Sequence, residues 1–181
     1  MLVYFVRHGE VENPEAVKYG RLPGFPLTQK GREQIKQTSE SLKEVGIGAI
    51  YASPLLRTKE SAQILSEMLG LPIIFDDRLL EHDHGKYTGV KIEEYKKMEY
   101  WRCGAETLEN CGDRVLDFLY DVKSQNKYQT ICVVGHQGPI IMAILNRAGK
   151  TVDDYNSIDL PMGGYLEYEF WRGRRLSTLQ Y

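Results

Sequence analysis

Cysteine and histidine are both scarce in this chain, which has three cysteines and four histidines among 181 residues. The cysteines, Cys103, Cys111 and Cys132, are odd in number and unevenly spaced. This spacing favours neither a set of disulfides nor a zinc site of the Cys-x-x-Cys kind. Free thiols are typical of a reducing compartment, so we expect a cytoplasmic protein.

The chain also lacks an excess of charge of one sign and lacks long hydrophobic runs. Its formal net charge is -2 at pH 7, which gives no electrostatic basis for binding nucleic acid. The short basic run 172–175 fits a solvated hairpin turn. The apolar start, Leu2 to Val6, is too short for a signal peptide or a membrane span. We therefore expect neither a nucleic-acid partner nor a membrane partner.

What the chain does contain is a regular alternation of apolar runs and amphipathic segments, with no internal repeat. Short apolar runs predict strands at 2–6, 49–52, 73–75 and 131–134, and helical spacing predicts helices at 28–45, 54–69, 91–101, 113–127 and 140–148. Two final strands, 165–171 and 176–179, would form a hairpin. The prediction is a single α/β domain over 1–181, a three-layer sandwich whose mainly parallel sheet has helices on both faces and an antiparallel C-terminal hairpin. Exposed strands of the hairpin are compatible with a homodimer, but nothing in the sequence requires one.

Histidines and arginines follow three of these predicted strands. Arg7 and His8 come directly after the first strand, and His136 follows the run that ends at Val134. Ser53, followed by proline, suggests a helix N-cap after a third strand and puts Arg57 in the first helical turn. Ligands of α/β sheets collect at the carboxyl ends of the strands. The sequence therefore predicts one crevice that holds two imidazoles and two guanidinium groups.

Such a set of groups favours a phosphate ligand over a carboxylate. Arginine forks bind phosphate oxygens in pairs, and helix N-termini near Pro54 and Pro139 would add N–H donors. Neutral imidazole is a competent nucleophile near neutral pH. Phosphoryl transfer through a histidine is the chemistry this predicts, with no cofactor and no metal.

At this point the chain resembles the histidine phosphatase superfamily, the phosphoglycerate-mutase-like proteins, whose signature is Arg-His-Gly after the first strand. The motifs that carry the resemblance lie in the family's order: Val6 to Glu10, Gly20 to Gly24 with Pro26 to Thr28 and Gly31-Arg32, Ser53 to Arg57, Leu80-Glu81 with Gly85 and Gly89, and Gly135-His136. Five ordered motifs over nearly the whole chain are far more specific than the tripeptide alone.

The resemblance implies a mechanism for the matching residues. His8 would attack phosphorus and become a phosphohistidine, while Arg7, Arg57 and His136 would hold the phosphoryl oxygens. Glu81 would protonate the leaving alkoxide and later deprotonate the attacking water. For this role we expect the pKa of Glu81 to be raised by anionic substrate and apolar walls. Without the resemblance, Glu81 would also fit an ordinary polar loop.

Residues that contact the rest of the substrate are predicted on the long connection after the first strand. Asn13, Tyr19, Arg21 and the backbone at Gly24 are candidates there, and Gln137 is one at the second histidine motif. Arg21 fits either a contact to a second anionic group or a side chain that lies along the surface. The expected partner is a small phosphorylated metabolite, such as a sugar phosphate, a phosphoglycerate or a phosphorylated nucleoside precursor.

The family pattern is not matched everywhere. Asn13 comes one position earlier than the usual asparagine. Gln137 and Ile141 stand where phosphatase relatives often have a small residue and an arginine. Tyr87 and Thr88 also depart from the common pattern before Gly89, so substrate contacts are the part left open.

Three alternatives accompany the phosphatase prediction. A phosphoglycerate-type mutase would share the phosphohistidine. The mutase branch of the family looks longer between the glutamate and the second histidine, however, whereas the segment from Glu81 to His136 is short. A non-catalytic module that binds phosphorylated partners would usually have lost its nucleophile, which His8 retains. Finally, His82 and His84 alternate around Asp83 and suggest a metal site, although lining the substrate entrance or facing solvent fits them better.

Overall fold

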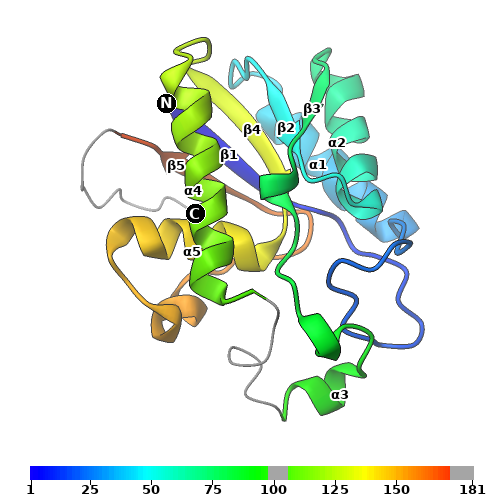
Figure 1. The fold of residues 1–181 in the computed structure, drawn as a ribbon. Coiled ribbons are helices and arrows are strands. Elements are labelled where there is room, and N and C mark those ends of the chain that lie inside the picture. Colours follow the sequence, from blue (N-terminus) through cyan, green and yellow to red (C-terminus); the bar gives the residue numbers. More distant parts are fainter. Residues whose placement is uncertain (98–105, 172–181) are drawn as a thin grey trace.

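One sheet joins strands from both ends of the sequence. The computed structural model describes residues 1–97 and 106–171, in which five strands run in the order β3-β2-β4-β1-β5 (Figure 1). The strands are β1 (Leu2–Arg7), β2 (Ile50–Ala52), β3 (Ile73–Phe75), β4 (Thr130–Gly135) and β5 (Tyr165–Glu169). The first four pair in parallel, and β5 pairs antiparallel with β1.

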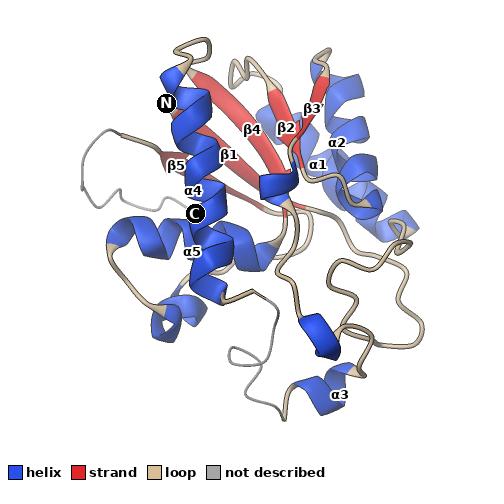
Figure 2. Ribbon diagram, in the orientation of Figure 1, coloured by secondary structure: helices blue, strands red, loops and turns tan. Residues whose placement is uncertain are grey.

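Helices cover both faces of the sheet (Figure 2). They are α1 (Gln29–Leu42), α2 (Leu56–Leu69), α3 (Ile92–Tyr95), α4 (Leu108–Ser124) and α5 (Gln137–Ala148). Side chains alternate along a strand, so Val3 and Phe5 join the core beneath α4 and α5, whereas Tyr4 and Val6 join the core beneath α1 and α2. The predicted three-layer α/β sandwich with an antiparallel edge is confirmed.

Local signals explain where several helices begin and end. The Thr28 hydroxyl accepts a hydrogen bond from the N–H of Gly31, which caps α1 as predicted. Gly70 and Gly149 end α2 and α5 in the left-handed conformation, at φ 68° and 71°, that favours glycine. Both glycines directly follow the predicted ends of these helices, residues 69 and 148.

Other predicted boundaries were wrong. Ser53 does not cap α2, because the residue before the helix is Leu55 and the Ser53 hydroxyl contacts His136 instead. Helix α4 begins at Leu108 and not at residue 113, because the Thr107 hydroxyl accepts a hydrogen bond from the N–H of Asn110 and caps it there. Helix α5 likewise begins earlier than predicted, at Gln137.

Parts of three predictions lie outside the described residues. These are the start of the segment 102–112, which the sequence predicts as a loop and of which residues 108–112 belong to α4, and the end of the helix at 91–101, of which the structure describes the turn Ile92–Tyr95. The basic run 172–175 and the last strand, 176–179, are the third, so the hairpin is described only through its first strand, β5. The homodimer stays a prediction.

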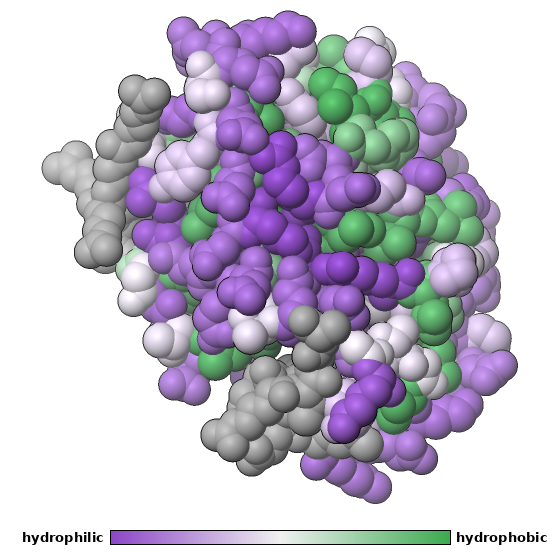
Figure 3. Space-filling view, in the orientation of Figure 1, coloured by the Kyte–Doolittle hydropathy of each residue, from purple (hydrophilic) through white to green (hydrophobic). Residues whose placement is uncertain are grey.

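The described surface is uneven in hydropathy. Hydrophobic residues gather over β3 and α2, while the surface over α4 is mostly hydrophilic (Figure 3). Strand β3 ends the sheet and exposes Ile74 and Phe75. No helix within residues 1–97 and 106–171 is long and apolar enough to cross a membrane.

Candidate active site

The parallel register brings the predicted residues to one edge of the sheet. Arg7 at the end of β1 pairs with Gly135 of β4, and Ala52 at the end of β2 pairs with Val134. The next residue along each strand is therefore His8, His136 or Ser53. The rings of His8 and His136 lie 5.4 Å apart, edge to face.

The chain turns sharply after His8 because it meets helix α1 at very short range. A Cβ atom on Gly9 would overlap the main-chain carbonyl of Gly31, and one on Gly31 would overlap that of Glu10. Both motif glycines are thus required by this contact. The N–H of Gly9 also donates to the hydroxyl of Ser61 on α2, which holds the turn in place.

The tautomer of His8 follows from its one hydrogen bond. Nδ1 lies 2.8 Å from the carbonyl oxygen of Gly9, and because a carbonyl only accepts, Nδ1 carries the proton. Nε2 is then the atom with the free lone pair in the neutral ring. Burial, and next the charge of Arg57, lower the pKa of His8 to about 3, so the ring is neutral at pH 7.

Arg7 and Arg57 each donate one hydrogen bond to a main-chain carbonyl and have further guanidinium nitrogens that can donate to a ligand. Arg57, which is fully buried, donates from one terminal nitrogen to the carbonyl of Gly20 at 2.8 Å. Arg7 donates to the carbonyl of Leu160 at 2.8 Å. Among the described residues, Nε of Arg7 and both Nε and Nη1 of Arg57 are buried without a hydrogen-bond acceptor. Buried donors of this kind are costly unless a ligand satisfies them, and a phosphate offers the required oxygens.

His136 completes this cluster from the third side. It precedes α5, and its Nε2 lies 2.9 Å from the hydroxyl of Ser53. Its Nδ1 is buried, has no hydrogen-bond partner among the described residues, and lies 3.8 Å from a carboxylate oxygen of Glu81. Burial lowers the pKa of His136 far below its ordinary value, even though Glu81 opposes this shift.

Glu81 faces these groups from the opposite wall. One carboxylate oxygen accepts the N–H of His82 at 2.9 Å, and a Cβ on Gly138 would lie 3.4 Å from the same oxygen. Burial favours a raised pKa for Glu81, but the interaction with the adjacent His136 ring and the charges of Lys18 and Arg57 outweigh it and lower the pKa. The rise expected with an anionic substrate stays a prediction, because in the protein itself the neighbouring cations act on the carboxylate and lower its pKa.

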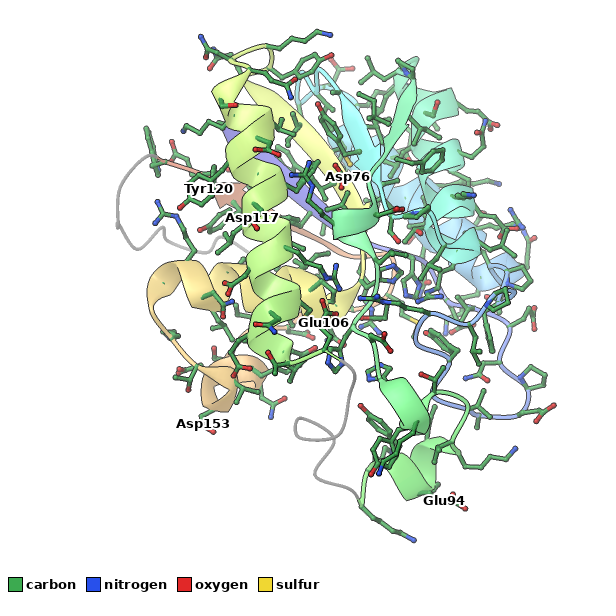
Figure 4. The ribbon with its side chains drawn as sticks, in the orientation of Figure 1. Asp76, Glu94, Glu106, Asp117, Tyr120 and Asp153 are labelled. Carbon is green, nitrogen blue, oxygen red and sulfur yellow. The ribbon has the colours of Figure 1, made fainter. Side chains whose placement is uncertain are left out.

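The main chain of Glu81 is held by a network that sequence analysis did not find. The carbonyl of Glu81 accepts from Nε of Arg21 at 2.6 Å and from a terminal nitrogen of Arg114 at 3.1 Å. Glu106 joins the two arginines through ion pairs of 2.8 Å and 2.6 Å. We call Arg21, Glu106 and Arg114 the clamp; Glu106 lies just before α4 (Figure 4). Arg21 thus matches neither predicted role, since it holds the candidate acid.

A cavity of about 370 Å³ opens beside this cluster. Of the predicted residues, Arg7, His8, Tyr19, Glu81 and Gln137 line it. The ring of Tyr19 also stacks on Arg57, with the guanidinium carbon 4.7 Å from the ring centre. Tyr19 and Gln137 are therefore placed where they can contact a substrate.

The structure does not bring the remaining substrate-binding candidates to the cavity. The side chain of Asn13 bonds both the N–H and the carbonyl of Val17, so it shapes the loop. Gly24 lies away from the cavity, at φ 87°, where it serves the turn. Neither position was separable from a substrate contact by sequence alone.

His82 and His84 are buried and do not face solvent. Their Nδ1 atoms lie 3.0 Å apart, and Nε2 of His82 donates to the carbonyl of Glu106 at 2.7 Å. The hydroxyl of Tyr95 lies 2.9 Å from Nδ1 of His84. The two rings thus bond each other instead of converging on a common point, and within residues 1–97 and 106–171 no cluster of three metal-ligating side chains occurs. Both rings line the cavity.

Comparison with known proteins agrees with this geometry. A family model described as the histidine phosphatase superfamily (branch 1) matches residues 3–180. The chain belongs to the histidine phosphatase superfamily. It is 32% identical over 150 residues to Phosphoserine phosphatase 1 of Hydrogenobacter thermophilus, a match that covers 75% of this chain and 70% of that protein.

Two further relatives mark the range of the family. The chain is 36% identical over 127 residues to the protein named Probable phosphoglycerate mutase GpmB of Salmonella paratyphi A, which covers 62% of this chain and 59% of that protein. The solved structure of Bacillus stearothermophilus YhfR superposes with a TM-score of 0.83 at 25% identity and covers 99% of this chain and 94% of that one.

Proposed function

We propose that this protein is a metal-independent phosphomonoesterase that acts on a small phosphorylated metabolite through a phosphohistidine on His8. The observation that carries the proposal is the group of buried guanidinium nitrogens on Arg7 and Arg57, beside a neutral imidazole, for which the described part of the chain offers no acceptor. Among common metabolite groups, a phosphoryl group satisfies several such donors at once and is also open to attack.

The first half-reaction transfers the phosphoryl group to the enzyme. Nε2 of His8 uses its lone pair to form a bond to phosphorus while the bond from phosphorus to the leaving oxygen breaks. Arg7 and Arg57 hold the equatorial oxygens and stabilise their charge. Glu81 gives its proton to the leaving oxygen, so that a neutral alcohol departs.

The second half-reaction reverses these roles. Glu81, now a carboxylate, takes a proton from water, whose oxygen attacks phosphorus and releases His8. Proton delivery requires Glu81 to be protonated in the complex. A phosphate dianion offsets the charge of Arg57 and raises the pKa of the nearby carboxyl, so substrate itself prepares the acid.

The decisive experiment traps the intermediate. The protein is mixed with a ³²P-labelled phosphomonoester in the presence of a chelator and quenched in a denaturant kept alkaline, because phosphohistidine is labile in acid. We expect label on the chain, located on His8 by peptide mapping, and steady release of phosphate. His8→Ala should carry no label and should lose turnover while its thermal melting stays cooperative. Turnover that requires an added metal, or label on another residue, would contradict the proposal.

A mutase remains the second candidate because of the similarity to the GpmB protein. Both activities use the same phosphoenzyme and differ in what accepts the phosphoryl group. The two are separated by incubating labelled phosphoenzyme with unlabelled 2- or 3-phosphoglycerate. A phosphatase releases inorganic phosphate, whereas a mutase returns the label to a phosphoglycerate.

A further inference from the structure

The rings of His8 and His136 are each held through one nitrogen, but by different kinds of partner. Nδ1 of His8 lies against the carbonyl of Gly9, which can only accept, so Nε2 of His8 keeps its lone pair. Nε2 of His136 lies 2.9 Å from the hydroxyl of Ser53, which can donate or accept. The tautomer of His136 therefore depends on where the proton of the Ser53 hydroxyl points.

Ser53 is fixed by contacts with two neighbouring elements. Its N–H donates to the carbonyl of Val134 in β4 at 3.0 Å, and its carbonyl accepts from the hydroxyl of Thr58 in α2 at 2.8 Å. Ser53 and His136 are both fully buried. Within residues 1–97 and 106–171, the Ser53 hydroxyl has no hydrogen-bond partner except His136. In this part of the chain its proton has an acceptor only if Nε2 of His136 carries a lone pair.

The other nitrogen of the His136 ring has the opposite requirement. Nδ1 is buried, has no hydrogen-bond partner in the described part of the chain, and lies 3.8 Å from a carboxylate oxygen of Glu81. A lone pair on Nδ1 would face this oxygen and be repelled by it. The phosphoryl oxygens that Arg57 holds in the proposed reaction are acceptors as well. A proton on Nδ1 suits both kinds of oxygen.

The His136 ring is neutral, so only one of its nitrogens carries a proton. Burial lowers the pKa of His136 far below its ordinary value. Besides burial, four side chains act on this pKa: Glu81, which raises it, and Arg57, His8 and Arg114, which lower it. With the single proton on Nδ1, Nε2 holds the lone pair and the Ser53 hydroxyl is the donor.

Ser53 matters most in the reacting complex. Glu81 must be protonated there to act as the acid, and a neutral carboxyl group no longer attracts a proton to Nδ1 of His136. The Ser53 hydroxyl is then the group left to hold the proton on Nδ1, because it keeps Nε2 as an acceptor.

This inference rests on the proposed function and adds a positioning residue to it. We propose that Ser53 fixes His136 in the tautomer whose Nδ1 carries the proton, so that the neutral ring donates a hydrogen bond to a phosphoryl oxygen. Ser53 does not line the cavity and acts through the ring. The Gly9 carbonyl and the Ser53 hydroxyl thus give two neutral imidazoles opposite roles. His8 offers a lone pair to phosphorus, and His136 offers an N–H to oxygen.

The tautomer can be observed without turnover. The chain has four histidines, so protein labelled with ¹⁵N-histidine gives few ring signals in a long-range ¹H–¹⁵N spectrum. The signals of His136 are the ones missing in His136→Asn. At pH 7 we expect wild-type His136 to have a protonated Nδ1 and an unprotonated Nε2.

A pair of variants isolates the effect of Ser53 on this tautomer. Glu81→Gln removes the carboxylate that also favours a proton on Nδ1, and it should keep the wild-type tautomer because the Ser53 hydroxyl is still present. Adding Ser53→Ala to Glu81→Gln removes the remaining donor. The ring should then exchange between its two tautomers, which is seen as averaging of the two nitrogen shifts.

Kinetics test whether the tautomer serves the reaction. Ser53→Ala should lower kcat/KM for p-nitrophenyl phosphate by about 10- to 100-fold, the cost of one hydrogen bond to a charged group. Ser53→Thr keeps the hydroxyl and should stay within about threefold of wild type. Ser39→Ala is the matched control, because Ser39 is also fully buried and its hydroxyl donates to the carbonyl of Ile35, away from the cavity. It should change kcat/KM by less than about twofold.

The outcomes separate this inference from the proposed function. A proton on Nε2 of wild-type His136, a single tautomer in the double variant, or wild-type kcat/KM in a folded Ser53→Ala each overturns the role of Ser53 and leaves the phosphatase standing. Thermal melting checks that each variant is folded. If Ser53→Ala does not fold, Ser53→Cys takes its place, because a thiol is only a weak donor. A protein that neither releases phosphate nor carries label on His8 contradicts the proposed function itself, while the tautomer is still read from the spectrum.

Discussion

The candidate active site, which is the cavity and the buried cluster beside it, has two walls that are built in different ways. The wall that carries His8, Arg57 and His136 is made of residues that directly follow parallel strands or begin the next helix, all of them at most 2% exposed. The opposite wall, which carries Glu81 and Lys18, consists of irregular chain joined by side-chain contacts to distant segments.

This difference separates reactivity from recognition. Groups on strand ends are fixed by the sheet register, so their geometry survives changes elsewhere in the chain. Groups on the irregular wall depend on contacts that span long distances in sequence, such as that of Arg114 with Glu81.

We call the wall that carries His8, Arg57 and His136 the reactive wall. The largest effect should come from exchanging its buried arginine, Arg57. Arg57→Met removes two nitrogens that have no acceptor within residues 1–97 and 106–171, together with the cation that we propose binds phosphate. We expect kcat/KM to fall by about 10³-fold, the scale of losing a preorganised donor to a transition state. The free energy of unfolding should rise by about 1 kcal/mol, because a buried, incompletely paired charge is replaced by an apolar side chain. Steady-state kinetics and urea denaturation measure the two changes.

Arg78 is the matched control for Arg57. It is paired with Asp76 at 2.8 Å and with Asp121, and it lies away from the cavity. Arg78→Met should reverse the pattern, with kcat/KM within about twofold of wild type and stability lower by about 1 kcal/mol or less. If Arg57→Met were the variant that lost stability, Arg57 would be a structural residue and the reactive wall would not be poised for an anion.

A smaller effect is expected from loosening the irregular wall at the clamp. Arg114→Lys keeps the charge but loses the planar fork that bonds Glu106 through two nitrogens and reaches Glu81. We expect kcat to fall about 10-fold with little change in KM, since the acid is misplaced and phosphate binding is not.

The leaving group distinguishes positioning from general damage. A nitrophenolate needs little protonation, so p-nitrophenyl phosphate should lose less activity in Arg114→Lys than an alkyl phosphate does. Glu81→Gln removes the acid itself, so it should also lose less activity toward p-nitrophenyl phosphate than toward an alkyl phosphate, with a larger difference than in Arg114→Lys. Arg32→Lys, which alters an ion pair with Glu60 at the surface, serves as the control and should change neither substrate. An equal loss for both leaving groups would show that the clamp does not act through Glu81.

The same two walls explain what could be predicted from sequence. Apolar runs and their terminal residues predicted the sheet, its edge and the meeting of His8 with His136, because strand ends in a parallel sheet converge. The clamp could not be found in this way, since Glu106 and Arg114 carry no local pattern and meet Glu81 only through the packing of α4. Ser53 is a second case in which local sequence was not enough. A serine before a proline has the local features of a helix cap, but here its hydroxyl contacts the imidazole of His136, which is distant in sequence.

The last prediction concerns the pH dependence of stability, which compares burial on the two walls. Burial lowers the pKa of His8 and of His84 to about 3. In the unfolded chain these rings bind protons as the pH falls below about 6.5, while the folded chain does not bind them until near pH 3. Stability should therefore fall between pH 6.5 and 5.0, by up to about 1.4 kcal/mol per pH unit for each such ring, in a window above the titration of most carboxylates.

Single substitutions show how much each wall contributes to this change of unfolding free energy with pH. His8→Gln and His84→Gln should each reduce it, as measured by urea denaturation at pH 6.5, 5.8 and 5.0. If His8→Gln lowers the slope and His84→Gln does not, then His84 is solvated in solution and the irregular wall opens, whereas the strand ends stay closed. Equal reductions would mean that both walls are equally closed before substrate arrives, and that recognition by the irregular wall works through fixed charges and not through a change in shape.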